Sequence, residues 1–511
     1  MAQRPREAPS AKSVQASQPR SNWTTEGKQL QSIYDTYAEN IHAISIRADS
    51  NSSLSGYGTL TGQGTRRSRN SMAWRLSSWQ TGFHLVSFMA GSGLVFMPFA
   101  LVEMDWYGLL VLGVAAVISI YTMQLLVEAM DILRWSSGKS VTYADLSREC
   151  FGPMAAYATD FLIYGGYLVN ATGYLTIVAA CLSAMTGARF GVMLVVVCAG
   201  VWFHVLVKSL KALAVFSAIN VGIAFWIEVV IFGDATYPLK QIALDKSAFT
   251  FGTADLSDES LFIKFAYSFT LAVGGFFCHS ILPMVYNAME DHRQCSKVAM
   301  RSQLSTLGFF YLPICVVTYA VYGDTLQAPV FFNMRNAIVR NLAIVLYCIH
   351  LLLSYTVTIF PLQRALEQRI LQPNTTSPSR LEEKRQSSIL LAASAHGSGD
   401  SLASKDESSQ EDSLLRRHER LVQIVSRTMV LLLTATLAYF FQLNTMGTLV
   451  GMIVPVTMLS LVLPCVFYWK LCTEEAGCLD KLAIIAIVSL ACLSMAASAS
   501  VVLRVSATIA P

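Results

Sequence analysis

The chain has 511 residues, of which 54% are hydrophobic and only 14% are charged, with a formal net charge of +4. A chain this apolar has too few polar residues to cover the surface of a soluble domain, so its composition predicts an all-α membrane protein. Its expected partner is therefore the lipid bilayer. The weak positive charge is not concentrated on a basic, aromatic-rich face, which excludes nucleic acid as a partner.

The first part of the chain is expected to lie outside the membrane. Residues 1–76 are rich in Ser, Gln and Arg and have no sustained apolar period, which predicts a disordered N-terminal tail. Within it, Tyr57 to Leu60 read YGTL, the tyrosine-based pattern Y-x-x-apolar that sorting adaptors bind, although such matches are also common by chance. No cleavable signal peptide is expected before the first span.

Eleven apolar stretches follow, each close to the roughly 20 residues that cross a hydrocarbon core about 30 Å thick. They cover residues 78–102, 107–130, 156–184, 191–207, 210–232, 261–286, 304–322, 337–361, 421–443, 448–469 and 482–502. Lys and Arg are more frequent in the loops that share a side with the N terminus. The positive-inside rule therefore predicts a cytosolic N terminus and a C terminus on the opposite side.

The connection after the eighth span differs from the other loops. Residues 367–420 contain a low-complexity stretch of serines and acidic residues, which predicts a disordered cytosolic insert within a transporter domain that spans residues 77–503. The eleven cysteines lie in spans or on the cytosolic side, and no Cys/His spacing fits a zinc site, so we expect no disulfide, metal or cofactor. The lack of predicted outer glycans and disulfides favours a vesicular, lysosomal or other internal membrane over the cell surface.

Two spans contain residues that interrupt a helix. The first has Gly91, Ser92 and Gly93 with a proline five residues later, and the sixth has Gly274 and Gly275 with a proline eight residues later. A helix broken inside the bilayer exposes N–H and C=O groups that protein, water or a ligand must satisfy. We therefore predict that these five residues bind substrate through their backbone groups. The alternative is that glycine and proline are simply frequent in membrane helices and allow close packing.

The spacing of the two interrupted spans predicts the domain organisation. They lie five spans apart, as in transporters built from two inverted repeats that bind substrate near the bilayer midplane. The first repeat then covers residues 77–233, the second covers residues 259–469, and residues 482–502 form an additional eleventh helix.

Four stretches resemble the amino acid/auxin permease family, also called the amino acid transporter transmembrane family. They are HLVSFMAGSGLVFMPFA from His84, TYADLSRECFG from Thr142, VKSLKALAVFSAIN from Val207 and YSFTLAVGGFFCHSILPMVYNAME from Tyr267. Within the family, the chain is similar to the vesicular inhibitory and the proton-coupled amino acid transporters. The resemblance implies a leucine-transporter-like fold and transport of amino acids or related small amines, coupled to protons or to sodium.

Polar residues inside the spans are candidates for ion coupling, because burying them is costly. His84 and His279 occupy positions where the resemblance implies proton coupling, and a structural hydrogen bond is the alternative for each. His350, Ser354 and Thr358 form one stripe on the eighth span, a candidate cation site, although such hydroxyls also bond to neighbouring helices. Two acidic residues, Asp160 and Glu228, could each pair with a histidine as a proton relay.

Together these features predict a secondary active transporter of amino acids that works by alternating access and is coupled to protons. Sodium coupling is one alternative. Another is an amino acid sensor that signals through the tail or the insert, and a channel is a third. No nucleophile with a paired base occurs at a catalytic spacing, so we do not expect an enzyme.

Overall fold

The computed structural model describes residues 75–102, 104–205, 207, 210–236, 260–326, 329–371, 403–442, 445–472 and 477–509. Of these, Ser92, Asp324 and residues 204–205, 403–418, 445–450 and 502–509 are described by their backbone alone. Residues 1–74 of the predicted tail, which include its YGTL motif, and residues 372–402 of the predicted insert lie outside the described residues.

All regular structure in these ranges is helical, which confirms the predicted all-α class. The first half contains α3 (Ser78–Phe96), α4 (Phe99–Val102), α5 (Tyr107–Ser137), α6 (Tyr143–Phe151), α7 (Pro153–Thr186), α8 (Phe190–Val205) and α9 (Leu210–Thr236). The sixth and seventh spans contain α10 (Leu261–Gly275), η1 (His279–Ile281), α11 (Leu282–Ala288), η2 (His292–Gln294), α12 (Cys295–Thr306), the π-helical η3 (Leu307–Tyr311) and α13 (Leu312–Tyr322).

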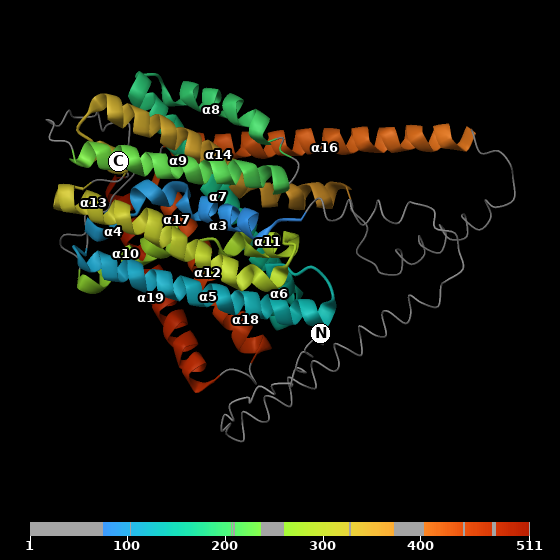
Figure 1. Ribbon diagram of the computed structural model, residues 1–511, viewed down its shortest axis with the longest axis horizontal. Coiled ribbons are helices and arrows are strands. Elements are labelled where there is room, and N and C mark those ends of the chain that lie inside the picture. The colour runs from blue at the N-terminus through green and yellow to red at the C-terminus, as the bar shows by residue number, and fades with distance from the viewer. Residues whose placement is uncertain are drawn as a thin grey trace, which may run out of the picture. The chain divides into compact units, whose positions relative to one another are not determined.

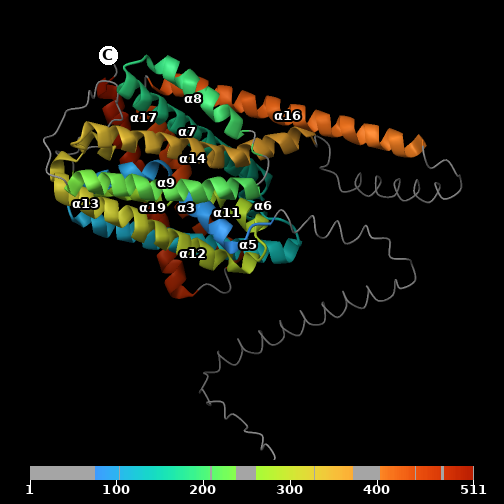
Figure 2. The ribbon, with the colours of Figure 1, turned by 45° about the horizontal axis from the view of Figure 1, so that its top comes forward.

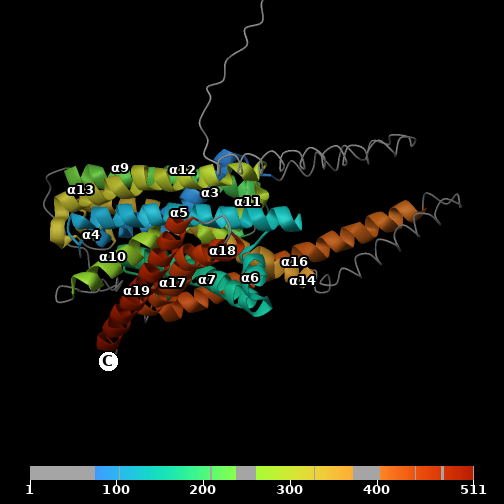
Figure 3. The ribbon, with the colours of Figure 1, turned by 90° about the horizontal axis from the view of Figure 1, so that it is seen from below.

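The remaining elements complete the second half of the bundle. They are η4 (Gly323–Thr325), η5 (Val330–Asn333), α14 (Ala337–Leu371), α16 (Ala403–Phe441), α17 (Thr445–Thr457), the π-helical η7 (Met458–Val462), α18 (Leu463–Leu471) and α19 (Cys478–Ile509). The long helices α5, α9, α12 and α14 run along one another (Figures 1 and 2). Helix α19 packs against α10 and α17 (Figure 3).

The described part of the chain does not confirm the predicted count of eleven membrane spans. In the described part of the chain, nine helices are long and apolar enough to cross a bilayer, or ten if the bent first span is included. The predicted fourth span is α8, which has only 16 residues, fewer than the roughly 20 that a straight crossing needs. Its apolar sequence therefore agrees with the prediction, but the count of eleven is not confirmed.

The first broken span lies at the centre of the bundle, where it contacts α9, α12 and α14. Its start is set by a capping box, in which Ser77 Oγ accepts a hydrogen bond from the Gln80 N–H at 3.3 Å. Just before it, the Leu76 N–H donates to the Ala288 carbonyl at 2.7 Å, and the Glu290 N–H donates to the Leu76 carbonyl at 2.9 Å. The start of α3 is therefore tied to the end of α11.

Both described ends of the predicted insert are helical rather than disordered. Helix α14 continues to Leu371, and α16 begins at Ala403. An ion pair accounts for part of this order, because Arg427 Nε of α16 donates to Glu367 Oε1 of α14 at 2.6 Å, and both side chains are buried. The two helices are thus held together on either side of the residues that the structure does not describe.

We expect Arg427→Gln to lower the free energy of unfolding by about 3 kcal/mol, because it removes the buried cation and leaves the Glu367 carboxylate only the half-exposed Arg364, 3.4 Å away. The change should appear as a lower melting temperature of the purified protein in detergent. Arg369→Gln is the matched control, since Arg369 is 68% exposed and its pair with Asp160 contributes about 1 kcal/mol or less. Equal melting temperatures for the two variants would contradict a structural role for the buried pair.

Candidate functional site

The first span is broken at the predicted position. Gly91 has φ −37° and ψ −116°, which is not helical, and the segments Ser78–Gly91 and Gly93–Val102 meet at an angle of 45°. A Cβ atom added to Gly91 would lie 2.5 Å from the Tyr174 hydroxyl of α7. Glycine is therefore required here because α7 approaches the backbone closely.

The sixth span is broken at the second predicted position. Helix α10 ends at Gly275, and helical structure resumes only at His279. The Phe277 N–H still bonds to the Gly274 carbonyl at 3.3 Å, which closes the last turn. Both interruptions that the glycines predict are thus confirmed.

Tyr311 connects the two breaks. Its hydroxyl lies 2.6 Å from the Met89 carbonyl oxygen on α3 and 2.8 Å from the Gly275 carbonyl oxygen on α10. A tyrosine has one O–H group, so it can fully satisfy only one of these two acceptors at a time. We call this arrangement the Tyr311 bridge.

The sequence analysis did not identify Tyr311. It is the last residue of the π-helical segment η3, and Pro313 follows two residues later. Proline has no N–H for the regular helical ladder, and π-helical turns are frequent at functional sites. A proline inside the seventh span was the available local signal, but the partners of Tyr311 are more than 35 and 220 residues away.

The close approach of the broken helices also depends on glycine. A Cβ atom on Gly93 would lie 2.8 Å from the Tyr311 hydroxyl and 3.5 Å from the Gly275 Cα atom. One on Gly275 would lie 3.1 Å from the Tyr311 ring. Gly274, in contrast, has open space around it. Gly93 and Gly275 therefore allow the backbones of α3 and α10 to approach each other, whereas Gly274 has open space beside it.

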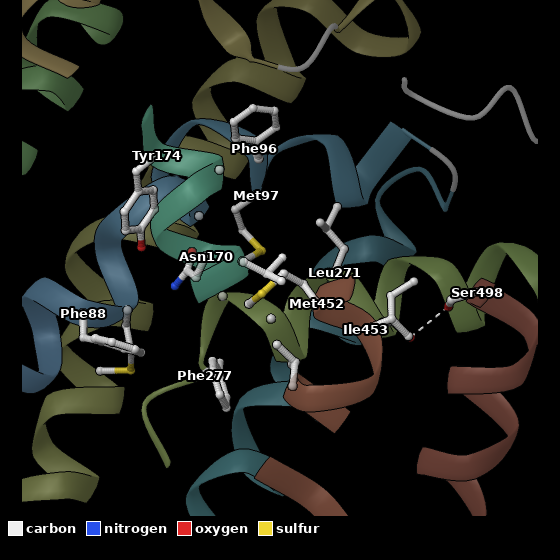
Figure 4. A pocket seen from close by; sticks show the side chains of 18 of the residues that line it. Phe88, Phe96, Met97, Asn170, Tyr174, Leu271, Phe277, Met452, Ile453 and Ser498 are labelled. Atoms are coloured by element: carbon white, nitrogen blue, oxygen red, sulfur yellow. Dashed lines mark hydrogen bonds between the residues drawn. The ribbon is translucent and has the colours of Figure 1, made fainter. Parts of the chain in front are cut away.

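A cavity of about 220 Å³ lies beside the two breaks (Figure 4). Helices α3, α7, α10, α17 and α19 form it, and none of its lining side chains is charged. The residues that line it include the predicted Gly93, Gly274 and Gly275, together with Phe88, Met89, Phe96, Met97, Asn170, Tyr174, Tyr267, Thr270, Phe277, Met452, Ile453 and Ser498.

The polar groups of the cavity are few. Asn170 lies among Tyr174, Met97 and Phe88 (Figure 4), and its amide makes no hydrogen bond to another described residue. Thr270 is occupied, because its hydroxyl lies 2.9 Å from that of Ser498. The Asn170 amide is therefore available to a ligand.

Neither predicted proton-coupling histidine lines this cavity. His84 is buried against α9, with Nε2 3.2 Å from the Leu210 carbonyl oxygen and Nδ1 2.9 Å from Ser217 Oγ. His279 is buried against α5, with Nε2 3.1 Å from Thr122 Oγ1. For His84, one neutral tautomer satisfies both contacts, as the structural alternative requires. For His279, only Nε2 is bonded, and Nδ1 is buried without a hydrogen-bond partner among the described residues.

The predicted cation stripe lies against the first break. His350 Nε2 is 3.1 Å from the Ala90 carbonyl oxygen and 3.3 Å from that of Gly91, and its Nδ1 is 3.3 Å from the Asn220 carbonyl oxygen. Ser354 accepts a hydrogen bond from the Asn220 amide at 2.9 Å, and that amide also donates to Ser87. The structure therefore brings His350 and Ser354 together with the backbone that the break frees.

The described residues show no assembled sodium site at this stripe. Sodium needs several oxygen ligands that face a common point, but the carbonyl oxygens of Ala90, Gly91 and Asn220 face imidazole nitrogens instead. Thr358 is buried one turn beyond Ser354, and its hydroxyl has no partner among the described residues. In addition, the described residues contain no cluster of three or more His, Cys, Asp or Glu side chains that could hold a metal.

Two membrane helices broken side by side around an uncharged cavity define the broken-helix class of membrane transporters. The family model described as "Transmembrane amino acid transporter protein" matches residues 75–509, so the chain belongs to that family. The family resemblance seen in the sequence is thereby confirmed.

Individual relatives are distant. The chain is 23% identical over 310 residues to the Arabidopsis thaliana amino acid transporter AVT1E, covering 56% of this chain and 53% of that protein. It is 24% identical over 302 residues to AVT1D of the same plant, covering 55% and 51%. The chain thus spans about half the length of the curated relatives it matches.

Among solved structures, the chain is similar to a Na⁺-coupled sialic acid symporter in a substrate-bound outward-open state. The TM-score is 0.51 at 11% sequence identity, and the match covers 86% of this chain and 91% of the symporter. At this identity the likeness concerns the fold alone, and it supports the leucine-transporter-like architecture.

Proposed function

We propose that this protein is a secondary active transporter of amino acids that works by alternating access. The observation that carries the proposal is that the broken ends of α3 and α10 lie at one uncharged cavity. The family, and the names of the plant relatives, support amino acids as the substrate class.

Backbone dipoles explain how an uncharged cavity binds a zwitterion. The segment Gly93–Val102 begins at the cavity, and the N-terminal end of a helix attracts a carboxylate. Helix α10 ends there at Gly274 and Gly275, and the C-terminal end of a helix attracts an ammonium group. The carboxylate and the ammonium group of an α-amino acid are only a few bonds apart, so one molecule can contact both broken ends.

The remaining cavity wall determines which side chains fit. The volume of about 220 Å³ is below the about 300–1,000 Å³ of pockets for drug-sized ligands, which suits a single amino acid. The wall is mainly aromatic and aliphatic, and the Asn170 amide is a free polar group. We therefore propose small or medium-sized amino acids, with Asn170 contacting the substrate.

We propose protons rather than sodium as the coupling ion, because the carbonyl oxygens beside the stripe face the imidazole of His350. We also propose that the N terminus is cytosolic, that the host membrane is an internal one, and that Tyr57 to Leu60 bind a sorting adaptor. They rest on the distribution of Lys and Arg and on the motifs of the sequence.

Counterflow in proteoliposomes tests the proposal. Vesicles containing the purified full chain are loaded with one unlabelled amino acid in excess and diluted into a trace of the same amino acid in labelled form. We expect the label to accumulate transiently for at least one amino acid of a complete panel, without any ion gradient. Asn170→Leu should change the ranking of the amino acids. If the wild-type protein binds amino acids but exchanges none, it is a sensor and the proposal is wrong.

A further inference from the structure

The buried carboxylates of the described spans differ in whether a cation or an N–H donor is bonded to them. Glu367 pairs with Arg427, as described above. Asp234, near the end of α9, accepts backbone N–H bonds from Arg335 at 2.6 Å and from Asn336 at 2.8 Å. Each of these two groups has the donors that stabilise an ionised carboxylate in a buried place.

Glu228 has no such donors. It lies on α9, 3% exposed, and its Oε1 atom is sealed from solvent without a hydrogen-bond partner. No Lys, Arg or N–H group of the described residues bonds to it. Because an unpaired carboxylate is far more costly to bury than a carboxylic acid, this environment accommodates Glu228 in its protonated form.

The neighbours of Glu228 follow from the packing of α9, which contacts α3, η3, α13 and α14. Six ionisable groups on these elements contact α9 residues or interact with them electrostatically: His84, Tyr311, Cys315, Tyr322, Arg340 and His350. Two of them, Tyr311 and Cys315, interact electrostatically with Glu228.

The described cations and histidines of this set are engaged elsewhere. Arg340 interacts with Asp234, six residues farther along α9. His350 contacts Asn220, eight residues before Glu228, and His84 contacts Ser217, one turn earlier still. Glu228 is therefore a buried acidic group whose charge acts on Tyr311 and Cys315, which lie on elements that pack against α9.

We infer that Glu228 binds the coupling proton and acts on the substrate site through the Tyr311 bridge. This inference rests on the proposed transport function and names its coupling residue. A proton from one side of the membrane binds a carboxylate oxygen, and the same O–H bond breaks when the proton leaves on the other side. While Glu228 is neutral, the Tyr311 hydroxyl donates to the Met89 or Gly275 carbonyl. Once Glu228 is ionised, it attracts that hydroxyl proton and weakens the link between α3 and α10.

Glu228→Gln tests the inference, because glutamine resembles the protonated side chain and cannot release a proton. We expect the variant to retain amino acid counterflow but to lose accumulation driven by a pH gradient, and to lose the proton uptake that accompanies it, measured with a dye inside the vesicles. Asp160→Asn is the matched control, since Asp160 pairs with Arg369 and is partly exposed. This control should retain both proton-dependent activities.

The outcomes separate the two proposals. Counterflow by the wild-type protein decides the transport function and does not depend on Glu228. If Glu228→Gln still accumulates substrate in response to a pH gradient, or if His350→Gln loses this response and Glu228→Gln does not, the inference is wrong.

The protonation of Glu228 can also be measured directly, without a transport assay. The infrared difference spectrum between the wild-type protein and Glu228→Gln at pH 7 should show the band of a buried carboxylic acid in the wild-type protein. The band should be absent from Glu228→Gln, and if that variant does not fold, it should be shifted in Glu228→Asp. The absence of any such band from the wild-type protein would overturn the inference.

Discussion

We expect the Tyr311→Phe variant to fold and to lose amino acid transport by about 5- to 150-fold. The substitution removes the O–H group that the Met89 and Gly275 carbonyl oxygens share. Leaving a buried acceptor without its donor costs about 1–3 kcal/mol, which corresponds to that range. We expect the variant to lose transport rather than folding, because the two carbonyl groups belong to the two helices that must move relative to each other at the cavity.

Counterflow per reconstituted molecule measures the effect. Tyr355→Phe is the matched control, since the Tyr355 hydroxyl is also buried and bonds to Thr434 Oγ1 at 2.9 Å, between α14 and α16 and away from the cavity. The control should retain most of its transport. Wild-type counterflow in Tyr311→Phe would show that the bridge has no part in the cycle.

The second large effect is expected for Gly93→Ala. Its Cβ atom would lie 2.8 Å from the Tyr311 hydroxyl, a distance that real Cβ atoms do not tolerate, so either Tyr311 or the broken helix must move. Such overpacking typically costs about 1–3 kcal/mol. Since the same shift breaks the Tyr311 bridge and narrows the cavity, we expect transport to fall at least as far as in Tyr311→Phe.

Gly82→Ala is the control on the same helix. There the added Cβ atom would lie 3.6 Å from Ser302 Oγ, an ordinary contact, and alanine favours a helix over glycine by about 1 kcal/mol. We expect this variant to transport normally and to melt at the same or a higher temperature. Normal transport by Gly93→Ala would mean that the two broken helices do not need their close approach.

The features that were predictable from the sequence are local ones. Gly91, Gly93 and Gly275 marked both breaks because glycines and a following proline occur together there, whereas the single Gly82 in α3 and Pro361 in α14 lie within helices. The all-helical class followed from apolar stretches long enough to cross a bilayer. The extents of α14 and α16 were harder to predict, because the polar residues 403–420 lack the apolar period by which the other helices were found, although α16 includes them.

The features that were missed depend on contacts between distant segments. Nothing near Tyr311 in the sequence indicates that its hydroxyl reaches Met89 and Gly275. For the same reason, His84 and His350 have the same residue type but different environments, since α9 offers a hydroxyl and a carbonyl oxygen to His84 but only a carbonyl oxygen to His350. The absence of a donor beside Glu228 is also a property of the packed bundle, which a periodic pattern cannot show.

The central claim is that an amino acid binds between the broken ends of α3 and α10. An electron cryo-microscopy structure of the protein with the amino acid selected by counterflow tests it most directly. We predict ligand density in the cavity beside Gly93 and Gly275, with the carboxylate at the start of the segment Gly93–Val102. Ligand density at another place, with the two broken ends making no contact to it, would contradict the account.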